Sequence, residues 1–206
     1  MQQSRVIPSP RSFACDLATL CAPTLAGLKP ASLFRYQPAP GQDAAAMAAA
    51  WHAALSPRGV TVRVLRQCPR TGAVLVYVYR PDRVARLLAA PHMLDFLAGE
   101  GYTPGTADEL LDQLAERLCC EGDFPHEIGV FLGYPLADVI GFIQNRGKNF
   151  TACGYWKVYT DPTAAQAASA SPSGEPLAMT GSTTRRAPAA SASSAQVRIH
   201  SPSPQP

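Results

Sequence analysis

The distribution of aromatic residues constrains the fold of this 206-residue chain most strongly. All seven Phe, seven Tyr and two Trp residues, and all six cysteines, lie at or before Tyr159, whereas residues 162–206 are mainly Ala, Ser and Pro. Ordering a backbone costs roughly 1–2 kcal/mol per residue, which a segment without large apolar side chains cannot offset by burial. The sequence therefore predicts one domain over residues 13–161, a flexible start at 1–12 and a disordered tail at 162–206.

Two segments in the first half of the chain have the patterns of β-strands. Residues 60–66 alternate valine with polar residues, and residues 73–79 form an almost continuous apolar run that is typical of a central strand. The connecting residues 67–72 are few enough for an antiparallel hairpin. Residues 32–36 and 154–159 also have strand composition, and we expect both to join the same sheet.

Helical spacing of apolar residues, together with capping signals, predicts helices around these strands. Thr106 and Glu109 form a capping box, in which the threonine oxygen and the glutamate carboxylate bind backbone N–H groups at the start of a helix. Further helices are predicted at residues 13–20, 42–55, 81–90, 91–98, 125–132 and 136–144. The combination indicates an α+β fold, with a small, mainly antiparallel sheet and helices packed on one face.

The charge balance argues against a general nucleic-acid-binding surface. The net charge is +3 at pH 7, whereas nucleic-acid binding usually needs a concentrated basic face. No window reaches the roughly 18 apolar residues of a membrane helix, and no secretory leader is recognisable. We therefore expect a cytoplasmic protein whose cysteines are thiols or ligands and not disulfides.

Residues 124–159 contain a pattern similar to a helix-turn-helix. Two short predicted helices meet at the turn Gly133–Pro135, and Gly129 lies where the helices must approach each other. The outward positions of the second helix offer almost nothing to phosphates or base edges; they are Ala137, Ile140, Gly141 and Gln144. We therefore interpret the motif as a structural corner, and a DNA-binding regulator is the third of three candidate functions.

Cysteine and histidine residues form the first group of candidate site residues. Cys21 follows the first predicted helix, His126 opens the helical corner, and Cys153 precedes the last predicted strand. If these residues converge, they can ligate a soft or borderline metal, or Cys153 can act as a thiolate with His126 as its partner. Each also has a structural explanation, because a free cysteine is often a small buried apolar residue and His126 can cap a helix.

Basic residues form the second group. Lys29 lies in a loop that is rich in Pro and Gly, and Lys148 lies in a glycine-containing loop before the last predicted strand. Arg63 and Arg66 belong to a set of seven arginines between residues 58 and 86, a window with a single acidic residue. These residues are candidates for binding an anionic ligand or a protein partner; the alternative is an ordinary surface role.

Three stretches of the sequence together resemble a known protein family. They are CAPTLAGLKPASLF (21–34), VRVLRQC with VLVYVYRP (62–81), and FPHEIGVFLGYPLADVIGFIQNRGKNFTACGYWKVY (124–159). The chain is similar over about residues 13–161 to an uncharacterised bacterial family, domain of unknown function 3793. The resemblance implies family membership and no particular activity. Relatives continue beyond the last strand into a charged helix that ends near another cysteine, where this chain has its Ala/Ser/Pro tail.

The sequence thus supports three functions in order of preference. The first is an accessory or ligand-binding protein, with metal or thiol redox handling as its chemistry and a small anionic ligand or a protein as its partner. The second is an enzyme that uses Cys153 or His126, and the third is the DNA-binding regulator. No motif identifies a cofactor or a substrate.

Overall fold

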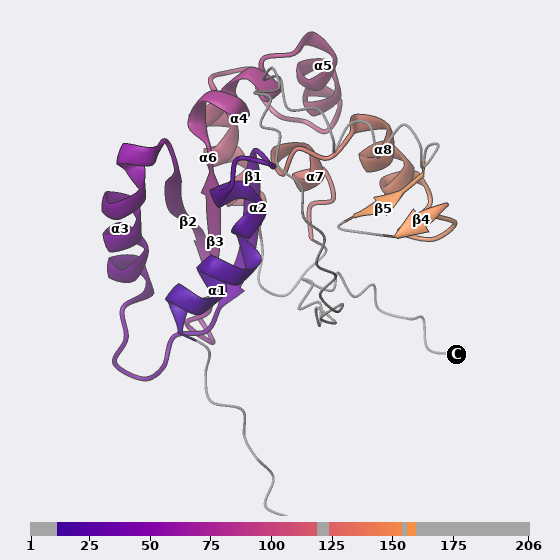
Figure 1. The fold of residues 1–206 in the computed structure, drawn as a ribbon. Helices are drawn as coiled ribbons and strands as arrows, with labels where there is room; N and C mark the ends of the chain where they lie inside the picture. Colours follow the sequence, from indigo (N-terminus) through magenta and orange to yellow (C-terminus); the bar gives the residue numbers. More distant parts are fainter. Residues whose placement is uncertain (1–11, 119–123, 154–155, 160–206) are drawn as a thin grey trace, which may run out of the picture.

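The computed structural model describes residues 12–118, 124–153 and 156–159 (Figure 1). Except for Ser12, which caps the first helix by accepting a hydrogen bond from the Cys15 N–H, the predicted flexible start and tail lie outside these residues. In the described part, the helices are α1 (Phe13–Leu20), α2 (Ala22–Leu25), α3 (Ala44–Leu55), η1 (Ser56–Arg58), α4 (Pro81–Leu88), α5 (Pro91–Gly99), α6 (Ala107–Arg117), α7 (Ile128–Phe131) and α8 (Leu136–Gln144). None of them is long and apolar enough to span a membrane.

One antiparallel sheet lies at the centre of the fold. Its strands are β1 (Ala31–Tyr36), β2 (Thr61–Gln67) and β3 (Val74–Tyr79), in the order β1–β3–β2. The apolar strand β3 is central and pairs along its length with both neighbours. The predicted hairpin and the predicted strand at residues 32–36 are therefore confirmed, as is the α+β class.

The last predicted strand, residues 154–159, does not join this sheet. Instead, β5 (Lys157–Val158) pairs with β4 (Ala152–Cys153) in a separate two-stranded sheet. The reason is that this segment is held by the helical corner: the Asp138 carboxylate on α8 accepts a hydrogen bond of 2.9 Å from the backbone N–H of Tyr159. This long-range bond leaves no trace in the strand pattern of the sequence.

Helices cover both faces of the three-stranded sheet, and not one face as predicted. The side chains of Val76 and Val78 pack with those of α1 and α3 on one face, whereas Tyr77 and Tyr79 pack with those of α4 to α7 on the other. Figure 1 shows α3 on one side of the strands and α7 and α8 on the other. Because β3 is apolar on both of its faces, each face must be buried.

The predicted helical corner forms from α7 and α8. A Cβ atom at Gly129 would lie 2.8 Å from Val139 Cγ2, so the two helices approach as closely as the glycine predicts. The Tyr77 hydroxyl donates a hydrogen bond of 2.5 Å to the carbonyl oxygen of Phe131, the last residue of α7. The corner is thereby attached to the central strand of the sheet.

Candidate functional site

The loop between α2 and β1 carries Lys29, and side chains of the neighbouring Arg80 and α4 hold it in place. Arg80 Nε donates a hydrogen bond of 3.0 Å to the carbonyl oxygen of Thr24, and Arg83 donates one to the carbonyl oxygen of Gly27. The last carbonyl groups of a helix have no partner within it, so guanidinium groups satisfy them here. These bonds give two members of the arginine-rich window a structural role.

The helical corner supports the same loop from its other end. Gly133, in the turn between α7 and α8, has φ +77° and lies directly against Pro30; a Cβ atom at this position would overlap Pro30 Cγ. Only glycine meets both requirements without strain or displacement of the loop. The contact places Lys29, the neighbour of Pro30, on Tyr134, the neighbour of Gly133.

The Lys29 ammonium lies on the ring of Tyr134. Its Nζ atom is 4.4 Å from the ring centroid and donates a hydrogen bond of 3.3 Å to the Tyr134 hydroxyl. Tyr134 in turn stacks on Trp156, with ring centroids 5.3 Å apart and planes inclined by 25°. Such a position over an aromatic face is a cation–π contact. We name these three residues, Lys29, Tyr134 and Trp156, the Lys29 site.

A buried carboxylate fixes the far side of this stack. Asp138, in the first turn of α8, is 2% exposed, and its Oδ2 atom accepts a hydrogen bond of 2.8 Å from Trp156 Nε1. Its Oδ1 atom accepts the backbone N–H of Tyr159. A buried carboxylate needs such donors to offset its lost hydration.

Sequence reasoning missed the role of Asp138. Asp138 follows Ala137, which was predicted to face outward, yet Asp138 is buried. Gly141, assigned to that outward face, is also buried, and a Cβ atom there would lie 2.6 Å from Tyr159 Cβ. An indole N–H needs an acceptor when it is buried. An acidic residue in an otherwise apolar helix, with a tryptophan further along the chain, is therefore the signal that could have predicted this hydrogen bond.

Burial shifts the pKa values of two neighbouring groups in opposite directions. Desolvation lowers the pKa of Lys29 to about 8, with the nearby Cys21 opposing the shift. Desolvation raises the pKa of the Cys21 thiol to about 12, which the charge of Lys29 opposes and that of Asp16 reinforces. Within the described residues, no carboxylate forms an ion pair with Lys29. At neutral pH, Cys21 is therefore a neutral thiol beside an ammonium group that loses its proton easily.

His126 belongs to a second cluster, around Phe142 of α8. The His126 and Phe142 ring centroids are 5.0 Å apart, those of Phe142 and Tyr159 are 6.5 Å apart, and Lys157 Nζ lies 5.6 Å from the Phe142 centroid. His126 Nδ1 and the Tyr159 hydroxyl are buried and form no hydrogen bond among the described residues. This cluster and the Lys29 site share one support, because Asp138 binds both Trp156 and the Tyr159 backbone.

The three candidate metal ligands lie in different surroundings. Cys21 is buried among side chains of α1 and β1, whereas His126 packs on Phe142. The backbone of Cys153 lies in β4 opposite Lys157, and its side chain is outside the described part. Among the described residues, no three His, Cys, Asp or Glu side chains come together in a group that could hold a metal ion. Convergence of Cys21, His126 and Cys153 therefore stays a prediction.

The remaining basic candidates lie at the surface. Lys148 is exposed in the turn after α8, and Arg63 forms an ion pair with Asp112 of α6. Arg66 is exposed at the penultimate position of β2. Of the four basic residues predicted to bind an anion, Lys29 is the one whose charged group lies over an aromatic ring.

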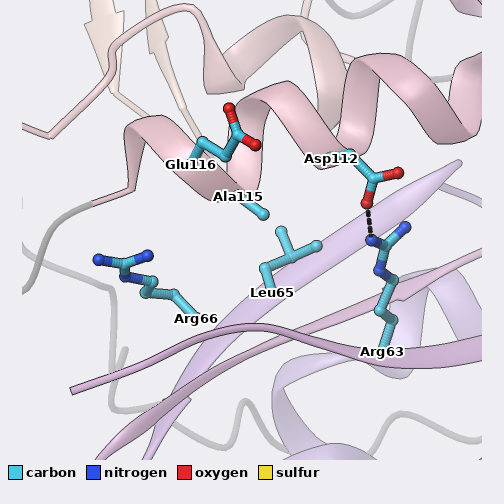
Figure 2. Close-up of a pocket in the computed structure, with 6 residues that line it drawn as sticks. All are labelled: Arg63, Leu65, Arg66, Asp112, Ala115 and Glu116. Atoms are coloured by element: carbon cyan, nitrogen blue, oxygen red, sulfur yellow. Dashed lines mark hydrogen bonds and ion pairs between the residues drawn. The ribbon is translucent and has the colours of Figure 1, made fainter. Parts of the chain in front are cut away.

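A surface hollow of about 500 Å³ lies between β2 and α6 (Figure 2). A β-bulge at Leu65 sets both Leu65 and Arg66 opposite Leu75, so that Arg66 comes to the same side of the sheet as Arg63. The strand β2 contributes two arginines and the helix α6 two acidic residues to the hollow, whose lining residues are Arg63, Leu65, Arg66, Asp112, Ala115 and Glu116. Its charges therefore balance, which gives it no preference for an anion.

The fold and the site define an α+β protein with a partly desolvated lysine on an aromatic stack. Residues 17–171 match the family described as "Protein of unknown function (DUF3793)". The match covers well over half of the chain, so the chain belongs to this family, as the resemblance predicted. No curated protein and no solved structure matches it. Two of the three stretches that carried the resemblance supply the Lys29 site: the first contains Lys29, and the third contains Tyr134 and Trp156.

Proposed function

We propose that this protein is a ligand-binding protein that holds a small anionic ligand at the Lys29 site. The observation that carries the proposal is the environment of the Lys29 ammonium. It has three N–H donors, of which one is used, to the Tyr134 hydroxyl, and it forms no ion pair among the described residues. Burial removes part of the hydration of this ammonium group, which is unfavourable. An anion that approaches the group replaces the lost water with a charge-assisted hydrogen bond.

The aromatic residues support a ligand with an apolar body. Small-molecule sites commonly combine an aromatic wall with a few polar groups that fix the orientation of the ligand. Here the wall consists of Tyr134 and Trp156, and the polar groups are the Lys29 ammonium and the Tyr134 hydroxyl. We therefore expect a carboxylate or phosphate attached to a planar or apolar group.

The other functions have less support. The thiolate, not the thiol, binds metals and acts as the nucleophile, and burial raises the pKa of Cys21 to about 12. A duplex-binding role for α8 loses part of its surface, because Gly141 faces Tyr159 and not solvent. An enzyme that uses Cys153 or His126 remains a separate hypothesis, which a turnover assay on the Cys153→Ser variant would test.

The test is a calorimetric titration with three probes: inorganic phosphate, benzoate and phenyllactate. We expect at least one carboxylate probe to bind wild-type protein, and the Lys29→Met variant, which keeps an apolar side chain of similar length, to lose this binding. Lys148→Met is the matched control, because it removes an exposed lysine outside the site. Equal binding by wild type and Lys29→Met, or no binding by any probe, would overturn the proposal.

A further inference from the structure

Lys29 differs from every other lysine of the chain. The sequence contains only three, Lys29, Lys148 and Lys157. Lys148 is exposed. Lys157 Nζ also lies over aromatic rings, those of Phe142 and Phe150, but its hydrogen bond of 2.6 Å goes to the carbonyl oxygen of Gly147 and not to a hydroxyl. Lys29 Nζ contacts an aromatic ring and a hydroxyl, neither of which favours the charged amine as strongly as a carboxylate would.

The Tyr134 hydroxyl is placed to move a proton to or from the Lys29 amine. Its oxygen lies 3.3 Å from Nζ, just beyond the range of about 2.6–3.2 Å for proton transfer, and such contacts shorten when a ligand binds. Burial raises the pKa of Tyr134, so its hydroxyl remains protonated at neutral pH. A protonated hydroxyl can donate to a developing oxygen anion beside the amine, as general acids do.

We propose that Lys29 forms an imine with the carbonyl carbon of a small α-keto acid. The neutral Nζ attacks this carbon, a C–N bond forms, and the carbonyl oxygen takes a proton to give a carbinolamine. The C–O bond then breaks, the oxygen leaves as water with a proton that the Tyr134 hydroxyl supplies, and a protonated C=N bond forms. The tyrosine recovers its proton from solvent. The net reaction joins amine and carbonyl with loss of one water, without an oxidant or a reductant.

The choice of an α-keto acid rests on the proposed function, which places an anion beside Lys29. A protonated imine keeps the positive charge of Lys29, so it still pairs with the carboxylate of the same ligand. The Tyr134–Trp156 stack provides the apolar surface for a side chain. The lowered pKa of Lys29, about 8, supports the step, because part of the amine is neutral near pH 7.5.

The experiment is reductive trapping on the full chain. Protein is incubated with phenylpyruvate and cyanoborohydride at pH 7.5, which reduces imines to stable amines, and the three lysines and the N-terminal amine are then compared by peptide mass spectrometry. We expect trapping at Lys29 to be at least tenfold faster than at Lys148, because desolvation lowers the pKa of Lys29 to about 8 and leaves part of its amine neutral at pH 7.5. Tyr134→Phe keeps the ring and should slow trapping at Lys29 several-fold without changing Lys148.

Two further measurements separate this inference from the proposed function. Binding of phenyllactate, which has no ketone, is measured on the wild-type protein beside the trapping of phenylpyruvate, and in the Lys29→Arg variant trapping at position 29 should be lost. If phenyllactate binds wild-type protein but phenylpyruvate is not trapped at Lys29, imine formation is wrong and anion binding stands. Equal trapping at Lys29, Lys148 and Lys157 would also overturn the inference, because it would show ordinary amine reactivity.

Discussion

Asp138 and Trp156 are joined by a hydrogen bond of 2.8 Å from the indole Nε1 to the carboxylate Oδ2. The bond connects helix α8 to the segment that follows β4, 18 residues away in sequence. It also fixes the indole against which Tyr134 stacks, and Tyr134 supports the ammonium of Lys29. The proposed site therefore depends on a buried acid two residues after the start of the second corner helix.

Asp138→Asn tests this dependence. The amide keeps one acceptor oxygen but turns an N–H₂ group toward a second donor, so one buried donor loses its partner, at a cost of about 1–3 kcal/mol in the free energy of unfolding. Denaturant unfolding, followed by Trp156 fluorescence in a Trp51→Phe background, measures the change. Asp95→Asn, at an exposed position of α5, is the control and should be neutral. Equal stability of the two variants would contradict the assigned role of Asp138.

Gly133→Ala tests the contact between the corner and the Lys29 loop. The added Cβ atom would overlap Pro30 and would also occupy a left-handed backbone conformation, so we expect a loss of about 2–4 kcal/mol in unfolding free energy. Gly72→Ala is the matched control, because Gly72 has φ +70° but no atom within 4 Å of the added Cβ. It should show the backbone strain alone. A loss of stability no larger than that of the control would mean that the Lys29 loop moves away from the added Cβ atom without a cost in free energy.

The pH dependence of anion binding follows from the pKa of Lys29, about 8 in the folded protein. Only the protonated amine attracts an anion, so affinity for phenyllactate should be constant below pH 7 and fall as pH rises through about 8. Calorimetric titration at pH 6.5, 7.5, 8.5 and 9 measures the profile. An affinity that stays constant to pH 9 would place the pKa of Lys29 near its ordinary value and would contradict the lowering of this pKa by burial.

Lys29 also affects stability with pH in a defined direction. Its folded pKa of about 8 lies below the ordinary value of 10.5, so the unfolded chain binds more protons between these values and the contribution of Lys29 to stability rises with pH across that window. Cys21 acts oppositely above pH 9, because its pKa is raised from 9.0 to about 12. Unfolding midpoints from pH 7 to 9 should therefore rise for wild type relative to Lys29→Met. A constant difference would contradict the burial of a charged Lys29.

The capping box at the start of α6 provides a test that is independent of the site. Thr106 Oγ1 accepts the Glu109 N–H at 3.3 Å, and Glu109 Oε2 accepts the Thr106 N–H at 2.6 Å. Thr106→Ala should therefore cost about 1 kcal/mol of stability, measured by denaturant unfolding. Thr106→Ser keeps the hydroxyl and should be close to wild type; a similar loss in both variants would show that the methyl group, not the cap, matters.

Features that depend on residues near one another in sequence were predicted correctly. The capping box, the apolar pattern of β3 and the glycine at the α7–α8 contact are all local, and each appears in the structure as expected. The prediction of helices on one face was wrong, even though its signal was present, because the apolar run of β3 has to be buried on two sides. The same rule that identifies a central strand thus also implies two covering layers.

The candidate site was predicted only as separate residues. Lys29 was identified as a cation in an unusual loop, but its partner Tyr134 lies 105 residues further along the chain, and no local pattern connects them. Arg63 and Arg66, which lie in the β2–β3 hairpin, were also predicted to bind an anion. The structure gives Arg63 an acidic partner, Asp112 on α6. Which cation is paired and which is not depends on the helices that pack beside it.

The sequence by itself determined the family and the identity of most helices and strands, because the patterns that identify them act over a few residues. Only the tertiary structure decided that Lys29 lies on Tyr134, that Asp138 is buried, and that the last strand belongs to the corner and not to the sheet. These outcomes depend on long-range contacts, such as Pro30 against Gly133. Their free energy comes from packing and hydrogen bonds between segments that carry no common local signal.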